Sequence, residues 1–160
     1  MVDKREIKIV NFEERHLEDF KRISYQWLNK FDLLEPVDIE MLDNPKENII
    51  DKGGYIFMAE VDGVTAGTLS LGYCDDKVYE LLKMGVDEKY QGMGIAALLL
   101  KETMKKAKEV NADKVILYTN HLLSPALHLY EKFGFKVLEL DKNKYDEADI
   151  KMECLLNKVN

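Results

Sequence analysis

The sequence has 160 residues, of which 46% are hydrophobic and 33% are charged, and its formal net charge is -7. A chain of this length can bury roughly 70% of the surface that its unfolded form exposes, so we expect a single domain over residues 1–160. The acidic balance disfavours a nucleic-acid binder, which needs positive charge against phosphates. It mildly favours a cationic partner such as an amine.

The sequence has no pattern typical of a metal-binding, disulfide-stabilised, secreted or membrane-spanning protein. Cys74 and Cys154 lie far apart and lack the spacing of zinc ligands, so we expect reduced thiols and no metal. The apolar run Ile95–Leu100 is much shorter than the roughly 20 residues that span a bilayer. The N-terminus is charged and has no secretory signal pattern. We therefore expect a cytoplasmic protein without membrane contacts.

The first half of the chain predicts a strand, two helices and three strands. Alternation predicts the strands, and apolar residues every three to four positions predict the first helix. Asp62-Gly63 suits the positive backbone angles of a tight hairpin turn between the second and third strands. The expected elements are a strand at residues 7–10, helices at about 13–31 and 39–42, and strands at 55–61, 65–73 and 78–86.

The second half predicts alternating helices and strands and completes a mixed α/β domain. A helix of about four turns is expected from Gly92, because the apolar residues after it recur at alternating spacings of four and three positions. Gly134 should stop the next helix. The remaining elements are a strand at 115–118, a helix at 124–132 and closing strands at 135–140 and 150–156. The last strand offers an edge for pairing in a possible homodimer.

The segment Gln91-Gly92-Met93-Gly94-Ile95-Ala96 follows a predicted strand and opens a predicted helix. The first amides of a helix lack internal partners and lie at the positive end of its dipole, so they attract phosphate when small residues permit the approach. A plain strand-to-helix turn explains two glycines equally well. A Walker lysine and a dinucleotide G-x-G-x-x-G with an acidic partner are both missing, which disfavours those two nucleotide classes.

The motifs resemble those of the GNAT acetyltransferase family. Gln91, Gly94 and Ala96 match its Q/R-x-x-G-x-G/A signature, and residues 125–135 resemble its A-x-x-L-Y-E-K-x-G-F segment. The order of elements is similar over nearly the whole chain. The resemblance implies a mostly antiparallel twisted sheet of six to seven strands flanked by about four helices. It also implies a splay between the strands ending near Val86 and Tyr118.

The resemblance further implies acetyl-CoA as cosubstrate. The pyrophosphate would lie on Gln91, Gly92, Met93, Gly94, Ile95 and Ala96, and backbone groups of Met84 and Val86 would bind the pantetheine arm. The side chains of Met84 and Val86 are equally consistent with plain core. Leu123 stands where many members have an asparagine that touches pantetheine, and Asn120 is the candidate substitute. Gln91 replaces the more usual arginine, so the backbone amides would carry more of the phosphate binding.

Two residues are candidates for proton transfer. A lysine-like amine has a pKa near 10.4 and must lose a proton before it attacks, and the resemblance suggests Glu80 as the base, directly or through water. Tyr130 matches the tyrosine that reprotonates the CoA sulfur in many members. The alternatives are a salt-bridged strand residue for Glu80 and a core aromatic for Tyr130. On an unbulged strand Glu80 and Met84 would share one face, and a bulge would break that pattern.

His121 and His128 have no metal-ligand spacing and no evident carboxylate partner, so both are expected on the surface or in helix packing. No Ser-His-Asp or Cys-His nucleophile arrangement stands out, which favours direct transfer in a ternary complex.

The acceptor side is the least defined part of the prediction. The resemblance places it against the first two helices and the late strands, where Trp27, Phe31 and Tyr145 are the candidate substrate-binding residues. Asp32, Glu35 and Asp149 lie in the same regions. The predicted function is transfer of an acetyl group from acetyl-CoA to a primary amine of a small molecule, amino acid, peptide or protein. The alternatives are a non-catalytic acyl-CoA-binding regulatory module, which Leu123 favours, and an interaction domain without a ligand.

Overall fold

The computed structural model describes residues 5–156, which form one seven-stranded sheet with the strand order β1-β2-β3-β4-β5-β7-β6. All neighbouring strands are antiparallel except β4 and β5, which are parallel. The strands are β1 Ile7–Asn11, β2 Tyr55–Val61, β3 Val64–Asp75, β4 Val78–Val86, β5 Lys114–Thr119, β6 Lys136–Leu138 and β7 Ile150–Leu155. The predicted fold class, with its mostly antiparallel sheet, is confirmed.

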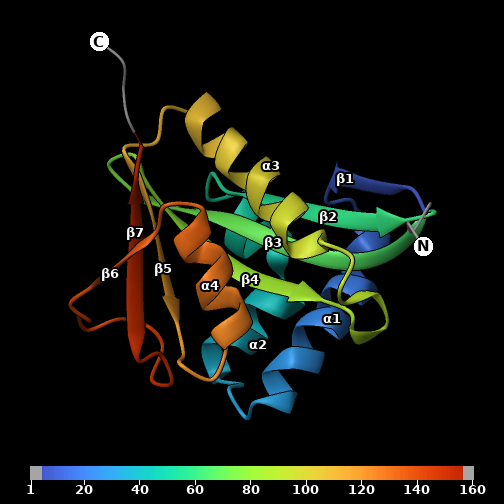
Figure 1. Cartoon of the computed structure of the whole chain (residues 1–160), viewed down its shortest axis with the longest axis horizontal. Coiled ribbons are helices and arrows are strands. Elements are labelled where there is room, and N and C mark those ends of the chain that lie inside the picture. The colour runs from blue at the N-terminus through green and yellow to red at the C-terminus, as the bar shows by residue number, and fades with distance from the viewer. Residues whose placement is uncertain (1–4, 157–160) are drawn as a thin grey trace.

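Helices cover both faces of the sheet (Figure 1). The α-helices are α1 Leu17–Lys30, α2 Pro36–Asp43, α3 Ile95–Glu109 and α4 Ser124–Lys132. Short turns of other helix types lie at Glu14–His16, Lys46–Ile50 and Glu88–Tyr90. In Figure 1, α3 and α4 lie in front of the sheet, and α1 and α2 lie behind it.

The sheet separates two apolar cores. Leu99 and Leu100 of α3 pack with Leu69 and Leu81 on the front face, and Phe20 and Leu42 of α1 and α2 pack with Leu82 on the back face. Phe20 and Leu100 fall on the apolar period of three to four residues that predicts α1 and α3, whereas the buried Leu99 lies off that period. No helix in the described part of the chain is long and apolar enough to cross a membrane.

The splay between β4 and β5 is present where the sequence predicts it. The two strands pair only from Val78 to Glu80 on β4 and from Lys114 to Ile116 on β5. The rest of β4, up to Val86, has no pairing with β5. Strands that twist apart after a short parallel contact leave backbone groups of both strands facing a gap, and this gap opens the cavity described below.

A bulge in β4 changes which residues share a face. The pairing with β3 shifts register between Thr68 and Ser70, and the opposite residue Lys83 has a left-handed backbone with φ of 55°. Leu82 therefore packs into the back core, whereas Met84 and Val86 pack against the front core. An extra residue reverses the alternation of a strand. The unbulged pattern, with Glu80 and Met84 on one face, is wrong.

Other differences concern element ends. Helix α3 begins at Ile95 because Gly92 and Gly94 have φ of 84° and 79°, outside the helical region. Strand β6 covers only residues 136–138 and is shorter than the predicted 135–140. Strand β7 is paired on one side with β5 and on the other with β6. It is therefore not a sheet edge over its β6-paired part, and the predicted pairing of this strand across a dimer interface is not available there.

Candidate active site

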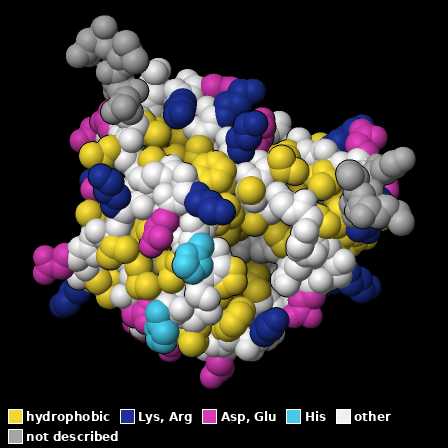
Figure 2. All heavy atoms as spheres, in the orientation of Figure 1, with side chains coloured by type: hydrophobic (Ala, Val, Ile, Leu, Met, Phe, Trp, Pro, Cys, Tyr) yellow, Lys and Arg dark blue, Asp and Glu magenta, His cyan; other side chains and the backbone are white. Residues whose placement is uncertain are grey.

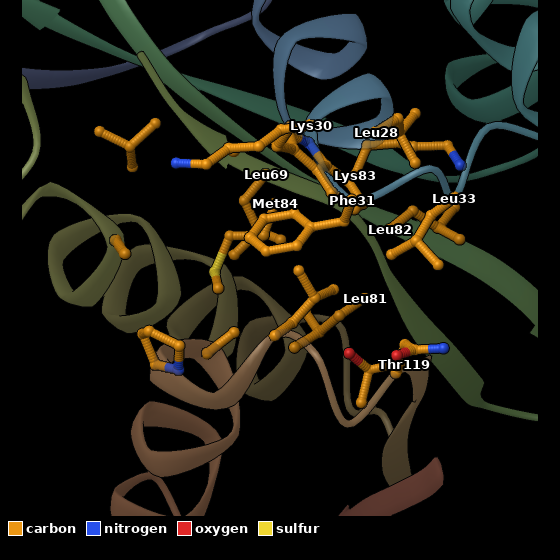
Figure 3. Close-up of a pocket in the computed structure, with 18 of the residues that line it drawn as sticks. Leu28, Lys30, Phe31, Leu33, Leu69, Leu81, Leu82, Lys83, Met84 and Thr119 are labelled. Atoms are coloured by element: carbon orange, nitrogen blue, oxygen red, sulfur yellow. The ribbon is translucent and has the colours of Figure 1, made fainter. Parts of the chain in front are cut away.

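A cavity of about 540 Å³ lies in the splay between β4 and β5. Figure 2 shows a hollow bordered by hydrophobic side chains on the face that carries α3 and α4. In Figure 3, residues 81–84 of β4 approach the cavity from one wall and Phe31 extends toward Met84. The expected site residues that line it are Trp27, Phe31, Met84, Val86, Gln91, Gly92, Gly94, Ile95, Ala96, Asn120, Tyr130 and Tyr145.

Met93 and Glu80 are not among the described residues that line this cavity. Met93 packs against the front core, with its sulfur toward the N-terminal segment. Glu80 lies on the back face of β4, as the bulge dictates. The structure thus brings most of the expected residues together around the cavity and leaves Met93 and Glu80 outside its lining.

The glycine loop forms one end of the cavity. Gly94 precedes α3 in a left-handed conformation, and Leu98 is the first residue of the helix to donate an N–H to it, over 3.2 Å. The amides of the first helical turn therefore lack helical acceptors and carry the positive end of the dipole. A side-chain carbon added at Gly92 or Gly94 would meet nothing within 4 Å, so the loop is open to solvent. The geometry is that of an anion-binding helix start.

The turn before this loop is fixed to α1. Arg22 donates to the carboxylate of Asp87, which also accepts the Lys89 amide at 3.0 Å. The Glu88 amide donates to Gln26 over 3.0 Å. Burial alone would raise the pKa of Asp87, but the Lys89 amide and the Arg22 guanidinium outweigh it and lower that pKa. Helix α1 thus holds the position from which the loop starts.

Gly85 allows α1 to lie directly on β4. A side-chain carbon at this position would lie 2.8 Å from the Trp27 indole, so only glycine fits without moving the ring. The indole Nε1 is buried and has no hydrogen-bond partner within residues 5–156. Trp27 and Phe31 thereby form the α1 side of the cavity.

Tyr130 of α4 lines the cavity and is only 7% exposed. Its ring lies 5.8 Å from that of Phe135, centroid to centroid, within the front core. Burial raises the pKa of the phenol above its usual value, so the hydroxyl stays protonated at neutral pH. Tyr130 is therefore both a core aromatic and a proton-bearing group at the cavity surface.

Glu80 is buried, with 4% of its surface exposed. Oε1 accepts a hydrogen bond from the Lys144 ammonium at 2.7 Å, while Oε2 is buried without a hydrogen-bond partner in the described chain. A buried carboxylate oxygen without a donor is costly, and such atoms often await a ligand, a water or a proton. The sequence alternative of a salt-bridged strand residue is thus present, together with an acceptor oxygen that the salt bridge does not use.

A buried ion pair that sequence reasoning missed lies at the other end of the cavity. Lys83, in the β4 bulge, contacts the Asp38 carboxylate of α2, and both line the cavity. Their side chains are only 4% and 3% exposed. Burial lowers the pKa of Lys83, although Asp38 opposes this shift. Asp38 also accepts the Glu35 amide at 2.9 Å at the start of α2. Because the bulge turns Lys83 inward, no alternation rule on β4 could have placed it there.

Comparison with known proteins identifies the family. The sequence profile of the Acetyltransferase (GNAT) family matches residues 16–135. The chain belongs to this family. The matched range contains β4, the glycine loop and α4, which are the elements that form the cavity and carry Tyr130.

Curated relatives of this GNAT protein are N-acetyltransferases. An N-alpha-acetyltransferase from Sulfurisphaera tokodaii is 34% identical over 115 residues, which make up 64% of this chain and 69% of that protein. Human N-acetylaspartate synthetase is 31% identical over 98 residues, or 61% of this chain and 32% of that protein. The chain thus spans only about a third of the human enzyme. The protein is accordingly an acyl-CoA-dependent N-acetyltransferase.

Solved structures confirm the GNAT fold. An acetyltransferase of the GNAT family from Staphylococcus aureus Mu50 has a TM-score of 0.86 and 24% identity, covering 95% of this chain and 100% of that one. The PaiA N-acetyltransferase from Thermoplasma acidophilum, solved in complex with coenzyme A, has a TM-score of 0.73 and 22% identity. That match covers 94% of this chain and 99% of the other.

In this GNAT protein Tyr145 and Glu147 of the segment 144–147 line the cavity, together with Glu35 and Asp38. Glu35 accepts the amides of Asp146 and Glu147 at 2.6 and 3.3 Å. Tyr145 is half-buried, and its ring lies 5.4 Å from the Lys83 ammonium. Burial, together with the charges of Glu80 and Asp38, raises the pKa of the Tyr145 phenol. The segment thus contacts Glu35, at the start of α2, through two backbone amides and Glu80 of β4 through the Lys144 ammonium.

Asn120 and His121 take roles that the sequence did not indicate. The Asn120 amide donates to the Glu147 carbonyl at 2.7 Å and accepts the Leu122 amide at 2.9 Å, so it fixes the segment after β5. His121 contacts Asp149 through its ring Nδ1 and its backbone N–H. The prediction that no carboxylate lies near this histidine is wrong, although the pair lies outside the cavity lining. Within the described residues, no group of three His, Cys, Asp or Glu side chains could hold a metal ion.

Proposed function

We propose that this enzyme transfers an acetyl group from acetyl-CoA to a primary amine by direct attack in a ternary complex. The observation that carries the proposal is the splay of β4 from β5 after Glu80, which opens one continuous cavity. A phosphate-binding helix start lies at one end of that cavity, and aromatic and acidic side chains lie at the other. Two substrates that must meet at one carbonyl need such a shared space.

The cofactor would enter with its pyrophosphate on the loop from Gln91 to Ala96. Its pantetheine arm would follow β4 beyond the bulge, where backbone groups of Met84 and Val86 face the gap that β5 leaves. An amide hydrogen bond to the thioester oxygen would stabilise the charge that develops there, an effect worth about 3 kcal/mol for an aligned donor. The coenzyme A complex of the similarly folded PaiA enzyme supports this assignment.

The chemistry needs one base and one acid. The acceptor ammonium loses a proton to the Glu80 carboxylate, through a water or polar group because Glu80 lies behind the cavity wall. The neutral nitrogen then attacks the thioester carbon, the carbon–sulfur bond breaks, and the nitrogen, now bonded to the acyl carbon, releases its second proton to solvent. Tyr130, which burial keeps protonated, donates its proton to the departing thiolate. The phenol afterwards regains a proton from solvent, and Glu80 releases the one that it accepted.

The acceptor would lie against Trp27, Phe31 and Tyr145. Their faces attract a cation before it is deprotonated, and Glu35 adds negative charge to the same cavity, where the charge of Asp38 is balanced by Lys83. The acidic balance of the chain acts in the same direction. A primary amine fits this end better than a neutral or anionic acceptor does.

Thiol release from acetyl-CoA across a panel of amines, with the acetylated product identified by mass spectrometry, tests the proposal. The panel should contain polyamines, amino acids, lysine peptides and peptides with free N-termini. Release that depends on the amine and falls about a hundredfold in Glu80→Gln supports the mechanism. Tight acetyl-CoA binding without release by any amine would instead support a regulatory module that only binds acyl-CoA.

A further inference from the structure

The N-terminal segment reaches the glycine loop across the sheet. Arg5, which precedes β1, is exposed, and its guanidinium carbon lies 5.7 Å from the centroid of the Tyr90 ring. Its Nη2 lies 3.2 Å from the sulfur of Met93. Tyr90 and Met93 flank Gln91 and Gly92 on either side, so a residue some 85 positions away in sequence holds a positive charge at this loop.

The loop itself supplies little side-chain charge. Gln91 is neutral, and its amide nitrogen points back to the Val86 carbonyl at 3.5 Å. Asp87 and Glu88, just before the loop, are paired with Arg22 and Lys30. The whole chain has a net charge of -7, which repels an anion. A cofactor with several phosphate groups is therefore favoured by cations near the loop, of which the exposed Lys89, two residues before Gln91, is one.

We propose that Arg5 binds a phosphate group of the acyl-CoA at the glycine loop and supplies the positive charge that Gln91 does not provide. The inference rests on the proposed use of acetyl-CoA. A guanidinium offers planar N–H groups that match two phosphate oxygens at once. A thioether sulfur is a weak acceptor, so a phosphate oxygen near Met93 is a stronger partner than the contact that Arg5 makes there now.

The ring of Tyr90 gives Arg5 a fixed position. A cation over an aromatic face is held without losing the in-plane directions of its N–H groups. Tyr90 also lines the cavity, which places its ring beside the path of the cofactor. Arg5 and the helix start would then contact phosphate from two sides, one through a side-chain charge and the other through backbone amides.

Isothermal titration with acetyl-CoA, dephospho-CoA and pantetheine tests this role in the full-length protein. Arg5→Met removes the charge and keeps an apolar arm that can pack on Tyr90. Lys8→Met is the matched control, because it removes one charge from an exposed residue of the same segment, on β1. We expect Arg5→Met to weaken acetyl-CoA binding about fivefold at low salt and less at high salt.

The control should change binding by less than about twofold, and neither variant should alter pantetheine binding, since pantetheine has no phosphate. A loss that persists with dephospho-CoA assigns Arg5 to the pyrophosphate, and a loss that disappears assigns it to the 3′-phosphate. Equal affinities of Arg5→Met and Lys8→Met for acetyl-CoA overturn the inference and leave the proposed function intact. Wild-type protein that binds no acetyl-CoA overturns both.

Discussion

The two ends of the cavity are constructed in different ways. The proposed cofactor end is a short contiguous stretch, Gln91–Ala96, in which backbone amides beside two glycines would bind phosphate. The acceptor end combines side chains from α1, α2, β4 and the segment 144–147, including the buried pair of Lys83 and Asp38. A site made of backbone can be recognised from local sequence. A site made of distant side chains depends on the fold that brings them together.

The two ends also differ in how much their buried charges reduce the stability of the fold. At the cofactor end the charged groups are at least partly solvated, apart from Asp87, which Arg22 compensates. At the acceptor end a lysine, an aspartate and Glu80 are nearly completely buried. Charges in such surroundings lose hydration and depend on their partners. We expect changes at the acceptor end to affect stability, and changes at the cofactor end to affect ligand affinity. Changes to the residues proposed to transfer protons should reduce turnover more strongly than changes at either end alter affinity or stability.

Removing the Tyr130 hydroxyl should have the largest effect, because this proposed proton donor would act where both substrates meet. Tyr130→Phe keeps the ring contact with Phe135 and removes the proton donor. We expect kcat to fall about a thousandfold, with less than a twofold change in the Kd for acetyl-CoA. Steady-state kinetics and titration calorimetry measure the two quantities. Tyr79→Phe, at another buried tyrosine, should leave both unchanged. Undiminished turnover of Tyr130→Phe would remove the acid role.

Breaking the buried ion pair should be the largest perturbation of stability. Lys83→Met leaves the Asp38 carboxylate buried without its counter-charge, which costs roughly 3 kcal/mol or more of unfolding free energy. Adding Asp38→Asn should recover part of that loss, since the asparagine carbonyl can still accept the Glu35 amide. Urea unfolding of wild type, both single variants and the double variant measures the coupling. Additive losses would show that the pair does not act as a unit.

Adding a side chain at Gly94 should weaken cofactor binding, with a smaller free-energy change than breaking the ion pair. The backbone there has φ of 79°, and a non-glycine residue in that region costs about 1–2 kcal/mol. Gly94→Ala should therefore favour other loop conformations in the free protein, and the free energy of restoring the binding conformation should raise the Kd for acetyl-CoA about tenfold. Gly63→Ala, in the β2–β3 turn at φ of 83°, carries similar strain far from the loop. It should lower stability by a comparable amount and leave the Kd unchanged, and a shift in both variants would point to a global effect.

The sequence placed the glycine loop at the start of a helix after a strand, and all of Gln91–Ala96 except Met93 line the cavity. Helical and strand periodicity placed the sheet and both helix layers, and Gly94 with Tyr130 gave the family pattern. The Lys83–Asp38 pair could not be predicted, because a single bulged residue reverses the faces of β4 and no spacing rule reports it. The contacts of Arg5 and of Lys144 depend on segments more than 60 residues apart meeting in space. The exposed His121 contacts the carboxylate of Asp149, which lies 28 residues further along the chain.

The smallest effect should come from the contact between Arg22 of α1 and Asp87, which fixes the turn before the glycine loop. Because the pKa of Asp87 is lowered below its usual 3.8, its stabilising contribution is present above that value and is lost as pH falls toward the folded-state pKa. Arg22→Met should cost about 1 kcal/mol at pH 7, and its unfolding free energy should approach that of wild type as the pH falls below about 4 toward the folded-state pKa of Asp87. Asp19→Asn removes the exposed partner of Arg22 and should change stability by only a few tenths of a kcal/mol. A difference between Arg22→Met and wild type that stays constant down to pH 3 would mean that Arg22 acts through packing. Helix α1 would then hold the loop by shape, and the charge on Asp87 would have no part in positioning the cofactor end.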